Sequence, residues 1–255
     1  MRTPKNQQTV PVESVDATWR ALYIIGGIAA LTAVLVFRRY FSVELMQFNG
    51  LGLISVPDDW PAGAAGWFAL FQESKLAGLL LFDLFDLVNY GLVGLIFLAL
   101  YGALRAVNPG AVLLALICAL VGIAVYFSSN QTLAMSHLSD RFAAAASEVE
   151  RATFVAAGEA LLAIHTQGTG MLLSLFLVLL AGLIISIVML RSVVFNKATA
   201  IAGILANGFG LGYFVALPFV PADDIWIFPT SSAPFRVLWY ILIAFKLFQL
   251  ARIKK

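Results

Sequence analysis

Charged residues are scarce in this sequence: only 12% of its 255 residues are Asp, Glu, Lys or Arg, whereas 61% are hydrophobic. A soluble domain carries about 25% charged residues and about 45–50% apolar ones. Half the usual charge is too little to cover a water-facing surface of this size. The composition therefore predicts that lipid is the solvent for much of the chain.

Basic tracts, paired cysteines and a signal-cleavage site are also missing. The formal net charge is only +2, without the clustered Lys and Arg that bind nucleic acid, so nucleic acid is not an expected partner. Cys118 is the only cysteine, which excludes an intrachain disulfide. Arg38 and Arg39, rather than a small-residue cleavage site, follow the first apolar stretch. We therefore interpret that stretch as a retained span rather than a removed signal.

Six apolar segments are present, each near the ~20 residues that cross a hydrocarbon core of ~30 Å. They cover residues 19–37, 85–105 (with an extension back to 75 left open), 111–127, 168–190, 198–219 and 232–250. The pattern predicts an all-α, polytopic transmembrane helical bundle with six spans. We expect it to form one domain, residues 18–255, after a polar, disordered cytoplasmic tail at residues 1–17.

The distribution of Lys and Arg predicts the orientation of these spans. With the N-terminus inside, ten Lys and Arg fall on the cytoplasmic side and six on the outer side, which accounts for the sixteen in the chain. Because cytoplasmic loops carry an excess of these residues, we expect both termini in the cytoplasm.

Two loops on the expected outer side are long. Residues 40–75 contain Trp60, Trp67 and Phe68, which suit a segment lying on the membrane surface because aromatic rings prefer the headgroup region. In the loop between spans three and four, Ser147 and Glu150 form a capping-box pattern. An apolar stripe follows it, which predicts an amphipathic outer helix packed on the bundle. Residues 128–139 are open to interpretation as a continuation of the third helix.

Ionisable residues inside apolar segments are the first place to look for function, because they are costly there. Asp83 and Asp86 precede Asn89 and Tyr90, and positions 83, 86 and 90 share one face of an α-helix. Counting about 20 residues outward from Arg105 puts the aspartates near the outer boundary of the hydrocarbon core. Other polar groups are expected at this level: Arg38, Arg39 and Arg236, together with Ser128, Asn130 and Gln131 at the end of the third segment and His165, Gln167 and Thr169 at the start of the fourth.

Two interpretations of this polar layer are open. In the first, the aspartates pair with Arg38, Arg39 or Arg236 and fix the helix arrangement, because buried charges usually have partners. Alternatively, the same residues form a ligand or ion site. His137 and His165, with an aspartate, would make a two-histidine, one-carboxylate metal set. The sequence has no closely spaced histidine pair to support such a metal site, so we predict no metal or cofactor. We expect each histidine either to be hydrogen-bonded within the protein or to face solvent.

Small residues follow one another at four-residue spacing in the fifth segment. Because small residues let helices approach closely, they predict a packing face, either within the chain or, as the weaker alternative, in a dimer. These residues are Ala202, Ala206 and Gly210, with Gly208 and Gly212 in a second row.

Three stretches carry a resemblance to a known family. LFDLVNYGLVGLIFLALYGALR, from Leu84 to Arg105, resembles the second span of the bacterial membrane-protein family called domain of unknown function 4386. GTGMLLSLFLVLLAGLIISIVMLRS from Gly168 and NKATAIAGILANGFGL from Asn196 resemble its later spans. The resemblance implies a multi-pass, six-helix bundle in the bacterial cytoplasmic (inner) membrane. It implies no activity and no site residues.

The sequence contains no catalytic motif, and three classes of function remain open. The first is a structural or accessory membrane protein, or one that binds a small-molecule ligand, with its polar layer near the outer surface. The second is a small-molecule or ion transporter. The third is an intramembrane metal-dependent hydrolase, which would require His137 or His165 to meet Asp83 or Asp86.

Overall fold

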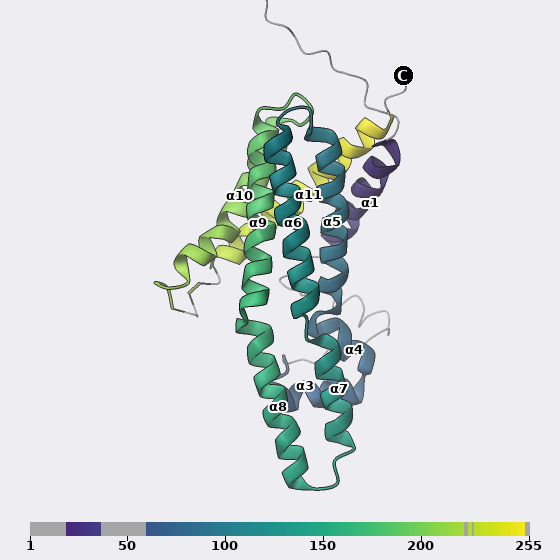
Figure 1. Cartoon of the computed structure of the whole chain (residues 1–255), viewed down its shortest axis with the longest axis vertical. Helices are drawn as coiled ribbons and strands as arrows, with labels where there is room; N and C mark the ends of the chain where they lie inside the picture. Colours follow the sequence, from purple (N-terminus) through teal and green to yellow (C-terminus); the bar gives the residue numbers. More distant parts are fainter. Residues whose placement is uncertain (1–18, 37–59, 222–223, 226, 253–255) are drawn as a thin grey trace, which may run out of the picture.

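The structure, a computed structural model, describes residues 19–36, 60–221, 224–225 and 227–252. All regular secondary structure in these ranges is helical, as the sequence predicts (Figure 1). The tail at residues 1–17 and the predicted polar-layer residues Arg38 and Arg39 lie outside the described residues.

An apolar bundle forms one end of the molecule. Within the described residues, five helical stretches are long enough and apolar enough to cross a membrane, which is compatible with an integral membrane protein. A shorter apolar helix of 17 residues, α1, packs against α5 and α11. The bundle helices are α1 (Arg20–Val36), α5 (Phe85–Leu104), α6 (Pro109–Ser129), α9 (Thr169–Leu190), α10 (Lys197–Ala216) and α11 (Ile227–Arg252).

Asparagine caps begin two of these helices where the sequence turns from polar to apolar. The side chain of Asn108 accepts a hydrogen bond from the backbone N–H of Ala111 at 3.1 Å, and Pro109 occupies the first helical turn. Asn196 caps α10 in the same way, through the N–H of Thr199 at 2.8 Å. Each cap satisfies a backbone donor that the first turn of a helix leaves without an intrahelical partner.

Four further described helices form a second unit, which we call the cap: α3 (Gly63–Glu73), α4 (Lys75–Leu79), α7 (Thr132–Ala143) and α8 (Glu148–Gln167). Helices α7 and α8 continue the lines of α6 and α9, and α3 and α4 pack beside them (Figure 1). A separate hydrophobic cluster holds the cap together; it includes Phe68, Phe71, Phe82 and Met135. The cap therefore has a core of its own, distinct from that of the bundle.

Three of the long helices change geometry where the cap meets the bundle. Between α4 and α5, residues Leu80–Leu84 form a π-helical turn, η2. Helix α6 ends at Asn130 and α8 ends at Gly168, both in an extended backbone conformation. At 1.5 Å per residue, α5, α6 and α9 each run about 30 Å from the opposite end of the bundle before these joints. The joints therefore share one level, about one hydrocarbon thickness from the far end.

Two expectations for the outer loops need correction. The rings of Trp67 and Phe68 face the protein interior rather than a surface: they are 4% and 0% exposed, because α7 and α8 cover them, whereas Trp60 is 52% exposed. The loop between the third and fourth apolar segments holds two helices, α7 and α8, rather than one amphipathic helix. Helix α7 continues the third helix after a break, the interpretation left open for residues 128–139, and α8 carries the predicted stripe. Ser147 caps α8 through the N–H of Glu150.

Candidate functional site

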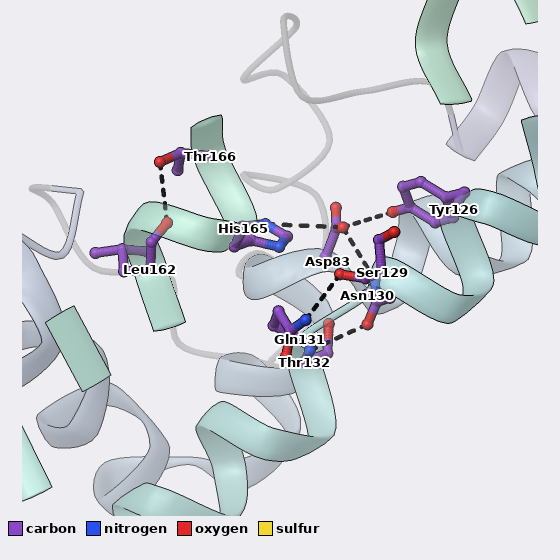
Figure 2. Close-up of polar contacts among 9 residues, drawn as sticks. All are labelled: Asp83, Tyr126, Ser129, Asn130, Gln131, Thr132, Leu162, His165 and Thr166. Carbon is purple, nitrogen blue, oxygen red and sulfur yellow. Dashed lines mark hydrogen bonds and ion pairs between the residues drawn. The ribbon is translucent and has the colours of Figure 1, made fainter. Parts of the chain in front are cut away.

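Asp83 is the centre of a buried polar cluster at the junction of cap and bundle. Its Oδ2 atom accepts hydrogen bonds from the hydroxyl of Tyr126 at 2.5 Å and from the amide of Asn130 at 3.0 Å. The Nε2 atom of His165 lies 3.8 Å from the same oxygen. We call these four residues the Asp83 clasp (Figure 2). The side chains of Asp83 and His165 are 1% and 3% exposed, so these contacts form away from bulk solvent.

The clasp joins the elements that meet at the junction. Asp83 projects from η2, Tyr126 from the last turns of α6, and His165 from the last turn of α8. Asn130 lies in the break between α6 and α7, where its Oδ1 atom also accepts from the N–H of Thr132 at 3.0 Å. Asn130 therefore starts α7 and holds Asp83 at the same time, which fixes the direction of the cap helix relative to the bundle.

A stacked pair of tyrosines extends the clasp into the bundle. The rings of Tyr90 and Tyr126 are parallel within 4°, with centroids 3.8 Å apart. Tyr90 lies within electrostatic range of Asp83, Asp86 and Arg236. The structure therefore gathers these predicted layer residues around one tyrosine, although Asp86 is half-buried and Asp83 is buried.

Arg236 enters this region from α11. Its guanidinium donates to the hydroxyl of Ser232 at 3.1 Å, and that hydroxyl donates to the carbonyl of Ala206 on α10 at 2.8 Å. Gly210 lies opposite the guanidinium: a Cβ atom built there would be 3.4 Å from a terminal nitrogen of Arg236. The glycine thus leaves room for a buried charged group between α10 and α11.

A half-open pocket of about 230 Å³, which we call the cavity, lies beside the clasp, on its cap side. His165 belongs to both, because its ring lines the cavity while its Nε2 atom faces Asp83. Phe82, the neighbour of Asp83 in sequence, lies 4.6 Å from the ring of His165, centroid to centroid. The cavity is lined by Trp60, Pro61, Trp67, Phe82, Leu162, His165 and Thr166.

This arrangement has defined chemical capabilities. The Oδ2 atom of Asp83 accepts hydrogen bonds from the side chains of Tyr126 and Asn130. Hydrogen bonds to an ionised acceptor of this kind are shorter and stronger than those between neutral groups. An imidazole beside that carboxylate can donate, accept or carry a proton at the cavity wall. The cavity itself offers aromatic surface together with two polar side chains, those of His165 and Thr166.

The remaining predicted site residues lie apart from the clasp. Asn89 is buried in α5, and its Oδ1 atom has no hydrogen-bond partner in the described part of the chain. Gln167 and His137 are exposed, at the end of α8 and on α7. Among the predicted small residues, Ala202, Ala206 and Gly210 are buried in the bundle, Gly212 faces Phe228, and Gly208 has open space beside it.

Sequence reasoning missed Tyr126 and the cavity wall. One signal for Tyr126 was available, because it precedes Asn130 by four residues and therefore shares its helix face. The wall residues come from segments about 100 positions apart in sequence, and no local pattern brings them together.

In the ranges that the structure describes, no three His, Cys, Asp or Glu side chains gather closely enough to hold a metal ion. Of the two histidines, His165 meets Asp83. Comparison of the chain with protein-family models, with curated proteins and with solved structures gives no match.

Proposed function

We propose that this chain is an integral membrane protein of six spans that binds a small molecule in the cavity beneath its cap. One observation carries the proposal. The cavity of about 230 Å³ is lined by His165, and His165 approaches the buried carboxylate of Asp83 at 3.8 Å. A concave, mostly apolar pocket with a few convergent polar groups is the usual form of a small-molecule site.

The surface of the bundle supports the membrane part of the proposal. In the most apolar 18-residue window of each long stretch, between 33% and 44% of the residues are buried inside the protein, so more than half of them keep some exposed surface. Ile28, Leu35 and Phe245, for example, are 55%, 62% and 62% exposed. An apolar area of this extent needs lipid around it. Helix α1 is about 26 Å long at 1.5 Å per residue, within the range of membrane-spanning helices, and makes the sixth span.

Charge asymmetry supports an orientation with both termini in the cytoplasm. The end of the bundle far from the cap carries basic side chains, whereas the described acidic residues lie at the cap end. The positive-inside rule assigns the basic end to the cytoplasm. The resemblance to a bacterial family adds the cytoplasmic membrane of a bacterium as the proposed location. Six of the ten described Lys and Arg lie at the end far from the cap: Arg20, Arg105, Arg191, Lys197, Lys246 and Arg252. The other four, Lys75, Arg141, Arg151 and Arg236, lie toward the cap end together with the acidic residues Glu73, Asp83, Asp86, Asp140, Glu148, Glu150, Glu159 and Asp224.

Cysteine labelling tests this topology. In a Cys118→Ser background, Ala146→Cys places a thiol in the α7–α8 turn, and Val193→Cys places one in the α9–α10 turn, where Val193 is 87% exposed. A membrane-impermeant maleimide should label position 146 in intact cells and position 193 after permeabilisation. The reverse pattern would overturn the orientation, and labelling of both positions in intact cells would overturn the membrane-spanning arrangement.

Ligand binding is favoured over transport by the interior of the bundle. A transported solute needs a route across the apolar layer, but the core beyond the tyrosine pair is closed by tightly packed side chains. Ile96, Leu100, Ile185 and Ile243 of that core are at most 1% exposed. The cavity, by contrast, lies on the cap side of this core. A binding site that opens to one side is the arrangement these contacts support.

A paired screen tests the binding function. Small amphipathic molecules are added to the purified protein in mild detergent, and the thermal unfolding midpoint is measured for wild type and for Leu162→Trp, which fills the cavity. A true ligand at 100 times its Kd stabilises the folded state by about 2.7 kcal/mol. The control is Ile164→Trp, which adds the same ring at a position 56% exposed on the same helix.

Molecules that stabilise wild type and Ile164→Trp but not Leu162→Trp would support the proposal. If every stabilising molecule acts equally on Leu162→Trp, the cavity is not the site. The clasp would then have the structural role alone, holding the cap on the bundle.

A further inference from the structure

The size of the cavity limits what it can hold. An engineered apolar cavity of about 150 Å³ binds one benzene molecule. Sites for drug-sized ligands measure about 300–1,000 Å³. At about 230 Å³, the cavity beneath the cap lies between the two. It therefore has room for one six-membered ring with one or two small substituents.

The wall of the cavity is built from aromatic rings in edge-to-face contact. Trp67 meets Trp60 at 5.5 Å and 85°, and meets Phe82 at 4.9 Å and 80°. Phe82 in turn lies against the ring of His165, with centroids 4.6 Å apart. Ring pairs prefer tilted or T-shaped geometry because the edge of one ring is positive and the face of the other negative. A planar aromatic guest can repeat this geometry on several sides, which a saturated guest of equal volume cannot.

One of the two polar side chains of the wall, Thr166, favours a hydrogen-bond donor on the guest. The hydroxyl of Thr166 donates to the carbonyl of Leu162 at 2.9 Å, which uses its proton within the helix (Figure 2). Its oxygen therefore has acceptor capacity at the cavity wall but no further proton to give. Thr166 is exposed in the absence of a guest, so a bound donor would replace solvent there.

We infer that the cavity binds a single-ring aromatic molecule that carries one O–H or N–H donor, with phenol as the simplest member of the class. The ring occupies the cavity that Trp60, Trp67 and Phe82 border, and the donor is directed to the Thr166 oxygen. This inference rests on the proposed function and adds to it the chemical class of the ligand.

Fluorine NMR with matched probes tests this class on the full-length protein in mild detergent. The probes are para-fluorophenol, which has the ring and the donor, and para-fluorotoluene, which lacks the donor. Unlabelled cyclohexanol, which has the donor but no aromatic ring, serves as the competitor. Line broadening is compared between wild type and Leu162→Trp, so that partitioning into detergent is subtracted.

Thr166→Val removes the acceptor while keeping the shape of the side chain. Thr153→Val is the matched control, because Thr153 is exposed on the same helix and donates to the carbonyl of Val149 at 2.9 Å. The loss of one neutral hydrogen bond should weaken para-fluorophenol binding about three- to tenfold in Thr166→Val. Binding by Thr153→Val should equal that of wild type, and para-fluorotoluene should not distinguish the two variants.

Each other outcome overturns a defined part of the inference. If para-fluorotoluene binds as tightly as para-fluorophenol, or Thr166→Val binds the phenol as wild type does, the donor requirement is wrong. Displacement of the phenol by cyclohexanol at similar concentration would overturn the aromatic requirement. If Leu162→Trp broadens the phenol signal as wild type does, the class as a whole is wrong. The proposed function would still stand if the stabilisation screen yields cavity-dependent ligands of another class.

Discussion

The hydroxyl of Tyr126 donates a hydrogen bond to Oδ2 of Asp83 at 2.5 Å, and this contact joins α6 to η2 where both leave the apolar bundle. The bond connects residues 43 positions apart, so it restrains the packing of two helices rather than a local turn. Asn130 and His165 bring the α6–α7 break and the end of α8 to the same oxygen. Three elements at the junction of cap and bundle therefore approach one buried carboxylate oxygen.

Tyr126→Phe tests the contribution of this bond. The substitution keeps the ring and its stacking on Tyr90 but removes a donor from a buried acceptor. We expect the free energy of unfolding to fall by about 1–3 kcal/mol, as for hydrogen bonds to charged groups. Thermal unfolding in mild detergent measures it. Tyr213→Phe is the control, because the Tyr213 ring packs on Phe214, away from the clasp. Equal midpoints for both variants would show that the bond does not stabilise the fold.

Separate substitutions of the two aspartates distinguish their roles. Asp83 is 3% exposed and holds the clasp, whereas Asp86 is half-buried. Asp83→Asn weakens two hydrogen bonds by removing the charge of their acceptor, and charged acceptors make bonds about twice as strong as neutral ones. We therefore expect Asp83→Asn to lower the thermal midpoint clearly more than Asp86→Asn does. If Asp86→Asn were equally destabilising, the layer would be held by the pair rather than by Asp83.

Most of the bundle follows from the sequence because hydropathy and length determine it. The Asn108–Pro109 start of α6 was also readable, since a cap and a proline at the first turn are local signals. Counting about 20 residues from Arg105 predicts that the boundary of the hydrocarbon core lies near Asp83, which stays a prediction. The structure has a π-helical turn at this position, Leu80–Leu84. The π-helical turn itself was not predictable, because a helical wheel assumes the same number of residues in every turn of the helix.

Long-range packing accounts for what the sequence did not predict. Trp67 and Phe68 have the composition of a membrane-surface segment, and whether such rings face headgroups or protein depends on which helices cover them. Here α7 and α8 do so, through contacts between residues more than 60 positions apart. Tyr126 was missed for the same reason: the polar layer placed Asn130 and His165 at the depth of Asp83, but depth alone does not show which side chain of the facing helix meets the carboxylate. The predicted pairing with Arg38 or Arg39 lies outside the described residues.

Gly158→Ala tests the docking of α3 on α8. A Cβ atom at position 158 would lie 2.7 Å from the Cβ of Ala64 and 2.7 Å from the Cζ of Phe68, closer than packed carbons approach. Because both neighbours are buried, we expect the methyl group to cost about 1–3 kcal/mol. Gly91→Ala is the matched control, since a Cβ atom there meets nothing within 4 Å. It should be neutral or stabilise α5 by about 0.5–1 kcal/mol. Thermal midpoints that fall equally would contradict this packing.

Glu159→Ala tests a cap that one helix provides to another. The Oε1 atom of Glu159, on α8, accepts a hydrogen bond of 2.6 Å from the backbone N–H of Ala64 in the first turn of α3. The preceding residue, Gly63, has φ +62, so the chain enters α3 by a turn that favours glycine. Loss of a capping acceptor costs about 1 kcal/mol, which should speed hydrogen exchange of the α3 amides about fivefold if they exchange by local opening. Glu148→Ala is the control, because the Glu148 side chain is 86% exposed and pairs with Arg151 in solvent. Unchanged exchange in Glu159→Ala would mean that α3 is held by its apolar face alone.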